Sequence, residues 1–163
     1  MRAFPQVFLS HGFRPFFLFA GSYAAIAAGA WLAQLHRMYE GSGGSVFPHG
    51  AMAPHLWHGH EMLFGYAGAT VAGFFLTAVP SWTGREPVRG PVLGALALVW
   101  LAGRIAMWAA PVLPLPLVAA LDLAFVPFLA VLVVRALEGG WSRRNAIFLP
   151  VFAALFAGNV LFH

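Results

Sequence analysis

The chain has 163 residues, of which 61% are hydrophobic and only 9% are charged. A soluble domain carries roughly 25% charged residues, so this composition excludes an ordinary water-soluble globule and indicates a protein whose main partner is the lipid bilayer. Nine arginines and five acidic residues give the net charge of +4, and most of the arginines lie at the ends of apolar segments. Because they form no basic stripe, we expect no nucleic-acid partner.

Five apolar segments approach the roughly 20 residues that cross a hydrocarbon core. They predict an all-α fold, a polytopic transmembrane helical bundle that forms a single domain over residues 1–163. In chain order, the expected spans are residues 16–35, 56–79, 92–110, 115–134 and 145–163. Small residues recur at every fourth position from Gly21 to Ala33 and from Gly65 to Gly73, which predicts close helix packing. We expect Pro127 to kink the fourth span.

The arginines predict the orientation of the bundle, because cytoplasmic loops carry the excess of basic residues. With the N-terminus inside, the outer segments contain only Arg37. The inner segments then contain Arg2, Arg14, Arg85, Arg89, Arg135, Arg143 and Arg144. We therefore expect a cytoplasmic N-terminus, with the loop that carries His36, His49 and His55 on the outer side.

A cluster of histidines lies where the second span is expected to begin. His55, His58 and His60 fall within six residues, and Glu61 follows directly. Imidazole is a common ligand of haem iron, copper and zinc, so the cluster predicts a metal or haem site formed by these four residues. The alternative is that the histidines only satisfy local hydrogen bonds at the membrane interface.

Helix geometry limits how the cluster can act. On a regular helix His58 and Glu61 share a face, whereas His60 lies about 200° away from His58. His58 and His60 can therefore bind the same metal only if the turn near Gly59 is irregular. Otherwise they have different partners. Because the chain has no cysteine, a haem would be held non-covalently, and copper would be bound by histidine, methionine or oxygen.

Two charged residues lie inside the third and fourth spans. Arg104 and Asp122 are each about nine residues from the Pro111–Pro114 turn, so antiparallel helices bring them to the same depth. Charges at this depth are costly unless they are paired, which predicts an ion pair. The pair would either anchor the two helices or take part in binding haem propionates or conducting protons. His163 ends the fifth expected span at the same outer level as the histidine cluster, so it is a further candidate ligand.

Four blocks of sequence resemble the NnrS family. They are His11-Gly12-Phe13-Arg14-Pro15-Phe16-Phe17, Trp57-His58-Gly59-His60-Glu61-Met62-Leu63-Phe64-Gly65-Tyr66, Gly73-Phe74-Phe75-Leu76-Thr77-Ala78-Val79-Pro80-Ser81-Trp82-Thr83-Gly84 and Trp100-Leu101-Ala102-Gly103-Arg104. The resemblance implies a bacterial inner-membrane protein that contains haem and copper and is linked to denitrification, nitric oxide and tolerance of nitrosative stress. Members are substantially longer, so this chain is expected to be the N-terminal part of a longer bundle, completed by a C-terminal half or an oligomer.

From these observations we expect a haem- and copper-binding membrane protein of the nitric oxide response. We assign His11, His58 and His60 as cofactor ligands from their chemistry, with Glu61 as the orienting partner or proton acceptor. His11 lies on the predicted cytoplasmic side and joins such a site only if the N-terminus re-enters the membrane. Two alternatives remain: a transporter of a metal ion or small solute, and a structural or assembly subunit without a cofactor.

Overall fold

The computed structural model describes residues 4–42, 46, 52–138 and 147–163, and every regular element in these ranges is a helix. In chain order, the elements are α1 (Phe4–Phe8), α2 (Phe13–Tyr39), α3 (Pro54–His60), the π-helix η1 (Glu61–Ala67), α4 (Gly68–Thr83), α5 (Pro91–Trp108), α6 (Leu115–Leu123), α7 (Phe125–Leu137) and α8 (Phe148–Val160). The predicted all-α bundle is confirmed.

Four helical segments in the described part of the chain are long and apolar enough to cross a membrane. They are Phe13–Tyr39, Pro54–Thr83, Pro91–Trp108 and Leu115–Leu137. The fifth apolar helix, α8, has 13 residues, which is short of the roughly 20 that a full crossing needs. The protein is thus a membrane protein, whereas five crossings and a single domain stay predictions.

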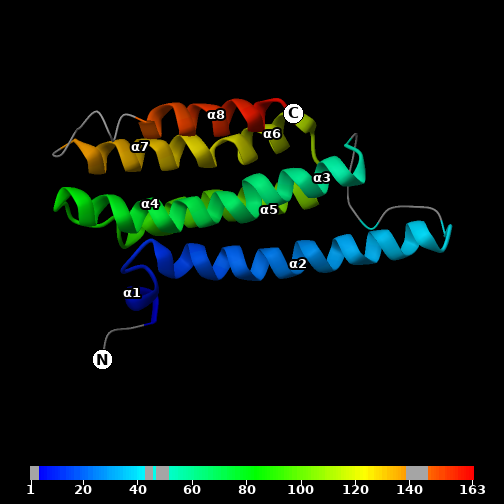
Figure 1. The fold of residues 1–163 in the computed structure, drawn as a ribbon, viewed down its shortest axis with the longest axis horizontal. Coiled ribbons are helices and arrows are strands. Elements are labelled where there is room, and N and C mark those ends of the chain that lie inside the picture. The colour runs from blue at the N-terminus through cyan, green and yellow to red at the C-terminus, as the bar shows by residue number, and fades with distance from the viewer. Residues whose placement is uncertain (1–3, 43–45, 47–51, 139–146) are drawn as a thin grey trace.

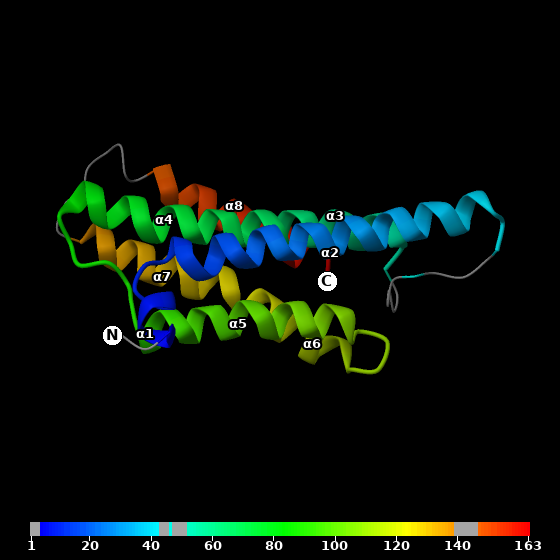
Figure 2. The same cartoon turned by 90° about the horizontal axis from the view of Figure 1, so that it is seen from below.

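The helices form a layered bundle (Figure 1). Helix α2 packs on η1 and α4, α4 packs on α7, and α7 packs on α8. Figure 2 shows α5 and α6 side by side along another face, where they also contact each other closely. The C-terminus lies near α3 and α6, at the end of the bundle away from the N-terminus. This arrangement brings the ends of α3, α5, α6 and α8 to one level.

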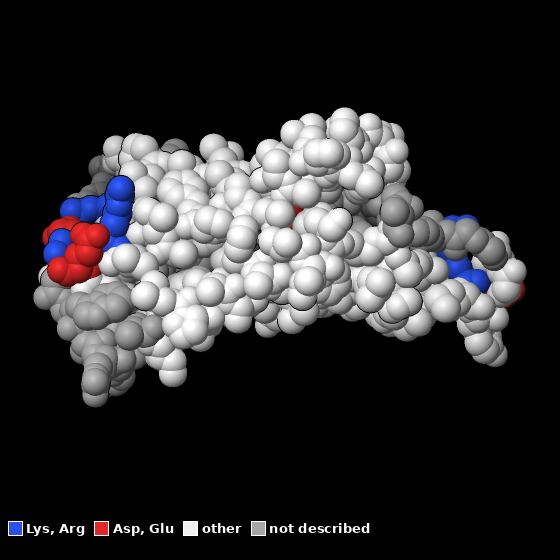
Figure 3. Space-filling view, turned by 90° about the horizontal axis from the view of Figure 1, so that it is seen from above, with Lys and Arg blue, Asp and Glu red and all other residues white. Residues whose placement is uncertain are grey.

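The visible surface supports a membrane-embedded orientation. Figure 3 shows the charged side chains gathered at the two ends of the molecule, with a broad surface almost free of charge between them. At one end, the exposed pair Arg89 and Glu86 lies in the α4–α5 connection. The same connection is tied to the N-terminal segment, because the Gly90 N–H donates to the Leu9 carbonyl over 2.8 Å.

Only one of the two rows of small residues packs against a neighbouring helix. A Cβ atom added at Gly65 would lie 2.6 Å from Cε1 of Tyr23, and one at Gly73 would lie 2.6 Å from the ring of Phe17. These glycines let α2 approach η1 and α4. Gly21 and Gly29 have open space around them, so the prediction that their row packs closely is wrong at both positions.

The fourth segment is interrupted as expected from its proline. Helix α6 ends at Leu123 and α7 begins at Phe125, with Ala124 between them. Leu123 is the residue four positions before Pro127, and the proline ring clashes with the carbonyl at that position in a continuous helix. The break therefore falls one turn before the proline and lies just after Asp122.

The contact at Gly65 leads to a stability prediction. Gly65→Ala places a methyl group against Tyr23, which is buried, and 3.0 Å from Nη1 of Arg104. We expect this overpacking to lower the free energy of unfolding by about 1–3 kcal/mol, measured by circular dichroism of the detergent-purified protein. Gly21→Ala is the control, since its site is open and alanine favours a helix. Equal stability of the two variants would contradict the close packing.

Candidate functional site

The site is a group of polar side chains buried in the apolar bundle, at the level where α3, α5, α6 and α8 meet. Its side chains are at most 4% exposed. They are His60 at the end of α3, Glu61 in η1, Arg104 in α5, Asp122 in α6 and Asn159 in α8. Ionisable groups at membrane depth are costly unless they are paired, and they usually mark functional sites.

Arg104 joins the two carboxylates of the group. Its Nη1 donates to Oε1 of Glu61 over 2.9 Å, and its Nη2 donates to Oδ1 of Asp122. Asp122 is the residue that the depth argument paired with Arg104. The backbones come close at this point because Gly103 has no side chain, and a Cβ there would lie 3.1 Å from the Cα of Asp122. The guanidinium therefore ties η1, α5 and α6 together.

His60 links the same carboxylates on the other side. Its Nδ1 lies 2.8 Å from Oε1 of Glu61, and its Nε2 lies 3.2 Å from Oδ2 of Asp122 and 2.8 Å from Oδ1 of Asn159. Asn159 also donates to Oδ2 of Asp122 over 2.8 Å. His163 is less buried and places its Nε2 3.1 Å from the same Oδ2.

Three of these residues lie close enough together to hold a metal ion. One donor atom each from His60, Asp122 and His163 lies within 4.8 Å of the others. Two imidazoles and a carboxylate suit copper, zinc or non-haem iron. Metal-ligating histidines usually have a carboxylate at their other ring nitrogen, and Glu61 occupies that position next to His60.

The π-helix η1 begins directly after His60. Short π-helical insertions are rare and occur often at functional sites. His60 and Glu61 are neighbours in sequence, yet both are fully buried. His60 contacts Asn159 of α8, while Glu61 accepts a hydrogen bond from Tyr23 of α2. The two side chains therefore connect opposite sides of the bundle.

The structure separates the other predicted ligands from this group. His58 stacks on Trp31 of α2, with ring centroids 4.7 Å apart and an interplanar angle of 10°. His58 and His60 thus have different partners, which was one of the two arrangements that helix geometry allowed. His55 is exposed. His11 lies between α1 and α2 and within 3.1 Å of Ser10. The junction of α1 and α2 is at the end of the bundle opposite α3 (Figure 1).

Several other histidines and methionines of the segment from α2 to η1 are not part of the group. His36 lies 3.3 Å from Glu40 in an exposed pair, and Met38 is exposed. Met52 and Met62 pack against apolar side chains. His49, like Arg2, Arg143 and Arg144, lies outside the described residues.

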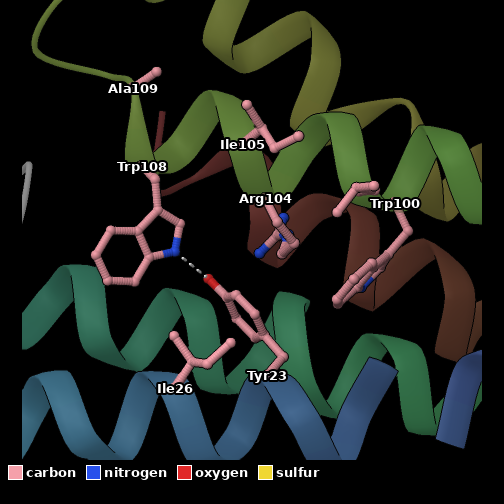
Figure 4. Close-up of a pocket in the computed structure, with 8 residues that line it drawn as sticks. Tyr23, Ile26, Trp100, Arg104, Ile105, Trp108 and Ala109 are labelled. Carbon is pink, nitrogen blue, oxygen red and sulfur yellow. Dashed lines mark hydrogen bonds between the residues drawn. The ribbon is translucent and has the colours of Figure 1, made fainter. Parts of the chain in front are cut away.

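Two members of the network were not predicted from the sequence. Asn159 and Tyr23 are isolated polar residues within apolar helices, and that isolation was the available signal. Tyr23 donates to Oε2 of Glu61 and accepts a hydrogen bond of 3.0 Å from Nε1 of Trp108 (Figure 4). The network therefore extends from His163 through the bundle to Trp108.

Comparison with known proteins identifies the family. The family model described as NnrS protein matches residues 7–163. The chain belongs to the NnrS family. The match extends beyond the four blocks that end at Arg104 and covers α6, α7 and α8. No curated protein and no solved structure matches the chain.

The central position of Arg104 can be tested by removing its charge. Arg104→Met leaves Glu61 and Asp122 buried without their cation, and breaking a buried pair in this way costs about 3–5 kcal/mol. We expect the free energy of unfolding, measured by denaturant unfolding of the purified protein, to fall by about this amount. Arg89→Met breaks the exposed pair with Glu86 and should cost at most about 1 kcal/mol. A similar cost for both variants would show that Arg104 is not a structural centre.

Proposed function

We propose that this NnrS protein binds copper in the bacterial inner membrane and acts in the response to nitric oxide and nitrosative stress. The single observation that carries the proposal is the convergence of His60, Asp122 and His163. With the N-terminus in the cytoplasm, as the arginine distribution predicts, this site lies toward the periplasm.

The distances between donor atoms fit a shared ion. Oδ2 of Asp122 lies 3.2 Å from Nε2 of His60 and 3.1 Å from Nε2 of His163. Ligand atoms that hold one ion at about 2.0–2.2 Å lie roughly 3.0–3.6 Å from each other. The same donors could also hold zinc or iron, and copper is proposed because of the family resemblance.

The charges of the site also favour a cation. Glu61 and Asp122 supply two carboxylates, and Arg104 is the guanidinium that contacts both. One negative charge therefore remains for a protonated His60 or for a metal ion. Glu61 holds Nδ1 of His60, which leaves Nε2 directed toward Asp122 and Asn159.

Each residue then has a defined task in the proposed site. His60, Asp122 and His163 would hold the ion, Glu61 would orient His60, and Asn159 would fix the orientation of Asp122 through its amide N–H. Copper bound there would supply a redox-active centre to which nitric oxide can bind. The apolar bundle excludes water around the buried members, which strengthens their electrostatic interactions.

Haem, the other cofactor implied by the resemblance, does not fit this group of side chains. The donors are already packed against one another, and His60 contacts Phe64 and Phe162 as well. A groove between α2 and α5 has no histidine in its lining, which is formed by Tyr23, Ile26, Trp100, Leu101, Arg104, Ile105, Trp108 and Ala109. Haem ligation by His11, His55 or His58 stays a prediction.

A second function is favoured by the completeness of the network. Arg104 already contacts both carboxylates, and both nitrogens of His60 have oxygen partners. A cofactor-free structural subunit would need this same pairing to hold its helices together in lipid. Metal binding therefore has to be measured directly.

Single substitutions can distinguish the proposed ligands, which include His163, from the histidines that neighbour His60 in the sequence, His55 and His58. Loss of a direct ligand in His163→Ala should weaken copper binding at least about tenfold, measured by titration and metal analysis of the detergent-purified protein. The matched variants His55→Ala and His58→Ala should retain it. Normal binding in His163→Ala with loss in the other two would instead support a site formed by the neighbouring histidines.

The role of Glu61 leads to a separate expectation. Glu61→Gln keeps the size of the side chain but removes the charge that holds Nδ1 of His60. Loss of such an orienting partner lowers metal affinity about 10–100-fold, so we expect weaker copper binding in a protein that still folds. Glu40→Gln, in an exposed pair with His36, is the control. Unchanged affinity in Glu61→Gln would exclude the orienting role.

A further inference from the structure

Helix α2 carries none of the proposed metal ligands, yet one of its side chains belongs to the same polar group. The ligands His60, Asp122 and His163 come from α3, α6 and the segment after α8. Tyr23 lies in α2, is 7% exposed and donates its hydroxyl hydrogen to Oε2 of Glu61. In the described contacts, Tyr23 therefore reaches the proposed ligands through Glu61.

The two carboxylate oxygens of Glu61 have different partners. Oε1 accepts from Nη1 of Arg104 over 2.9 Å and lies 2.8 Å from Nδ1 of His60. Oε2 accepts from the Tyr23 hydroxyl. Glu61 is fully buried, so a charged Oε2 without this donor is costly. Rotation of the carboxylate to find Oε2 another donor would move Oε1 away from His60.

Trp108 determines the direction in which the Tyr23 hydroxyl donates. The indole N–H of a tryptophan can only donate, and Nε1 of Trp108 lies 3.0 Å from the hydroxyl oxygen of Tyr23 (Figure 4). The oxygen of Tyr23 accepts this hydrogen bond, and its own single hydrogen is given to Glu61. The chain of hydrogen bonds from Trp108 to Glu61 therefore has one direction.

The ring of Tyr23 is also held in place. Trp100 contacts it edge-on, with ring centroids 5.6 Å apart and an interplanar angle of 83°. Nε1 of Trp100 donates to the Gly65 carbonyl over 3.1 Å, and the missing side chain of Gly65 leaves room for the Tyr23 ring. The hydroxyl is thus presented to Glu61 from a ring that is packed on two sides.

We propose that Tyr23, oriented by Trp108, is a positioning residue for the proposed copper site and acts through Glu61. Its hydrogen bond holds the Glu61 carboxylate in the orientation that keeps Oε1 at Nδ1 of His60. A carboxylate at this nitrogen fixes the orientation and tautomer of a metal-ligating histidine, so Nε2 of His60 is directed to the metal. This inference rests on the proposed copper site and extends it to side chains of α2 and α5.

Tyr23→Phe tests the role because it removes the hydroxyl and keeps the ring. Loss of an orienting partner lowers metal affinity about 10–100-fold. Tyr23 acts one hydrogen bond further away, so we expect copper binding to weaken about 3–10-fold and the EPR spectrum of bound Cu(II) to change. Tyr66→Phe, which removes the hydroxyl of a tyrosine that is 40% exposed in η1, should match the wild type. Equal affinity and equal spectra for the two variants would overturn the proposal.

A double substitution distinguishes positioning from a general loosening of the bundle. If Tyr23 acts through Glu61, the effects of the two substitutions are not additive. Adding Tyr23→Phe to Glu61→Gln should then change copper affinity less than about twofold. The same loss in the Glu61→Gln background as in the wild type would show that the effect does not pass through Glu61, and would also overturn the proposal.

NMR of the metal-free protein with ¹⁵N-labelled histidine separates this inference from the copper site itself. The Nδ1–H of His60, hydrogen-bonded to Glu61, should give a downfield proton resonance that is absent in His60→Gln. Tyr23→Phe should shift or broaden this resonance, and Tyr66→Phe should not. An unchanged resonance in Tyr23→Phe contradicts the positioning role. A wild-type protein that binds no copper would overturn the proposed site, while the resonance would still decide whether Tyr23 positions Glu61.

Discussion

The buried guanidinium of Arg104 is the interaction on which the rest of the structure depends. It holds Glu61 of η1 and Asp122 of α6 at the same time. In lipid no water can solvate these charges, so each must remain next to its partner. The positions of η1, α5 and α6 relative to one another follow from this constraint. Gly65 and Gly103 provide the space in which the helices come close enough to satisfy it.

The same guanidinium divides the polar interior into two parts with different chemistry. On one side, the carboxylates face His60, Asn159 and His163, where charge and donor geometry favour a cation. On the other side, the groove between α2 and α5 is lined mainly by aromatic and aliphatic side chains. Glu61 contacts both parts, since it binds Arg104 and His60 and also accepts from Tyr23.

The sequence correctly predicted which side chains lie at the same depth in the bundle. It did not predict which side chains point toward one another. Counting residues from a turn places Arg104 and Asp122 at one level, because helix rise per residue is constant. Counting does not say which face of a helix meets a neighbour. Helix geometry separated His58 from His60 but did not say which of them points into the polar group, and the structure shows that it is His60. Asn159 and Tyr23 gave a weaker signal, because one polar residue in an apolar helix has no partner that local spacing can identify.

By itself, the sequence determined that this is an all-α membrane protein of the NnrS family, because hydrophobic segment length and short motifs are local properties. It also determined which charges share a depth. Only the tertiary structure decided which side chains meet. His60 contacts Asn159 and His163, which lie about one hundred positions later in the sequence. The π-helix η1 begins directly after His60, and the break between α6 and α7 lies directly after Asp122 and Leu123. Such contacts depend on how helices rotate and pack, and the burial of charge in lipid selects one arrangement.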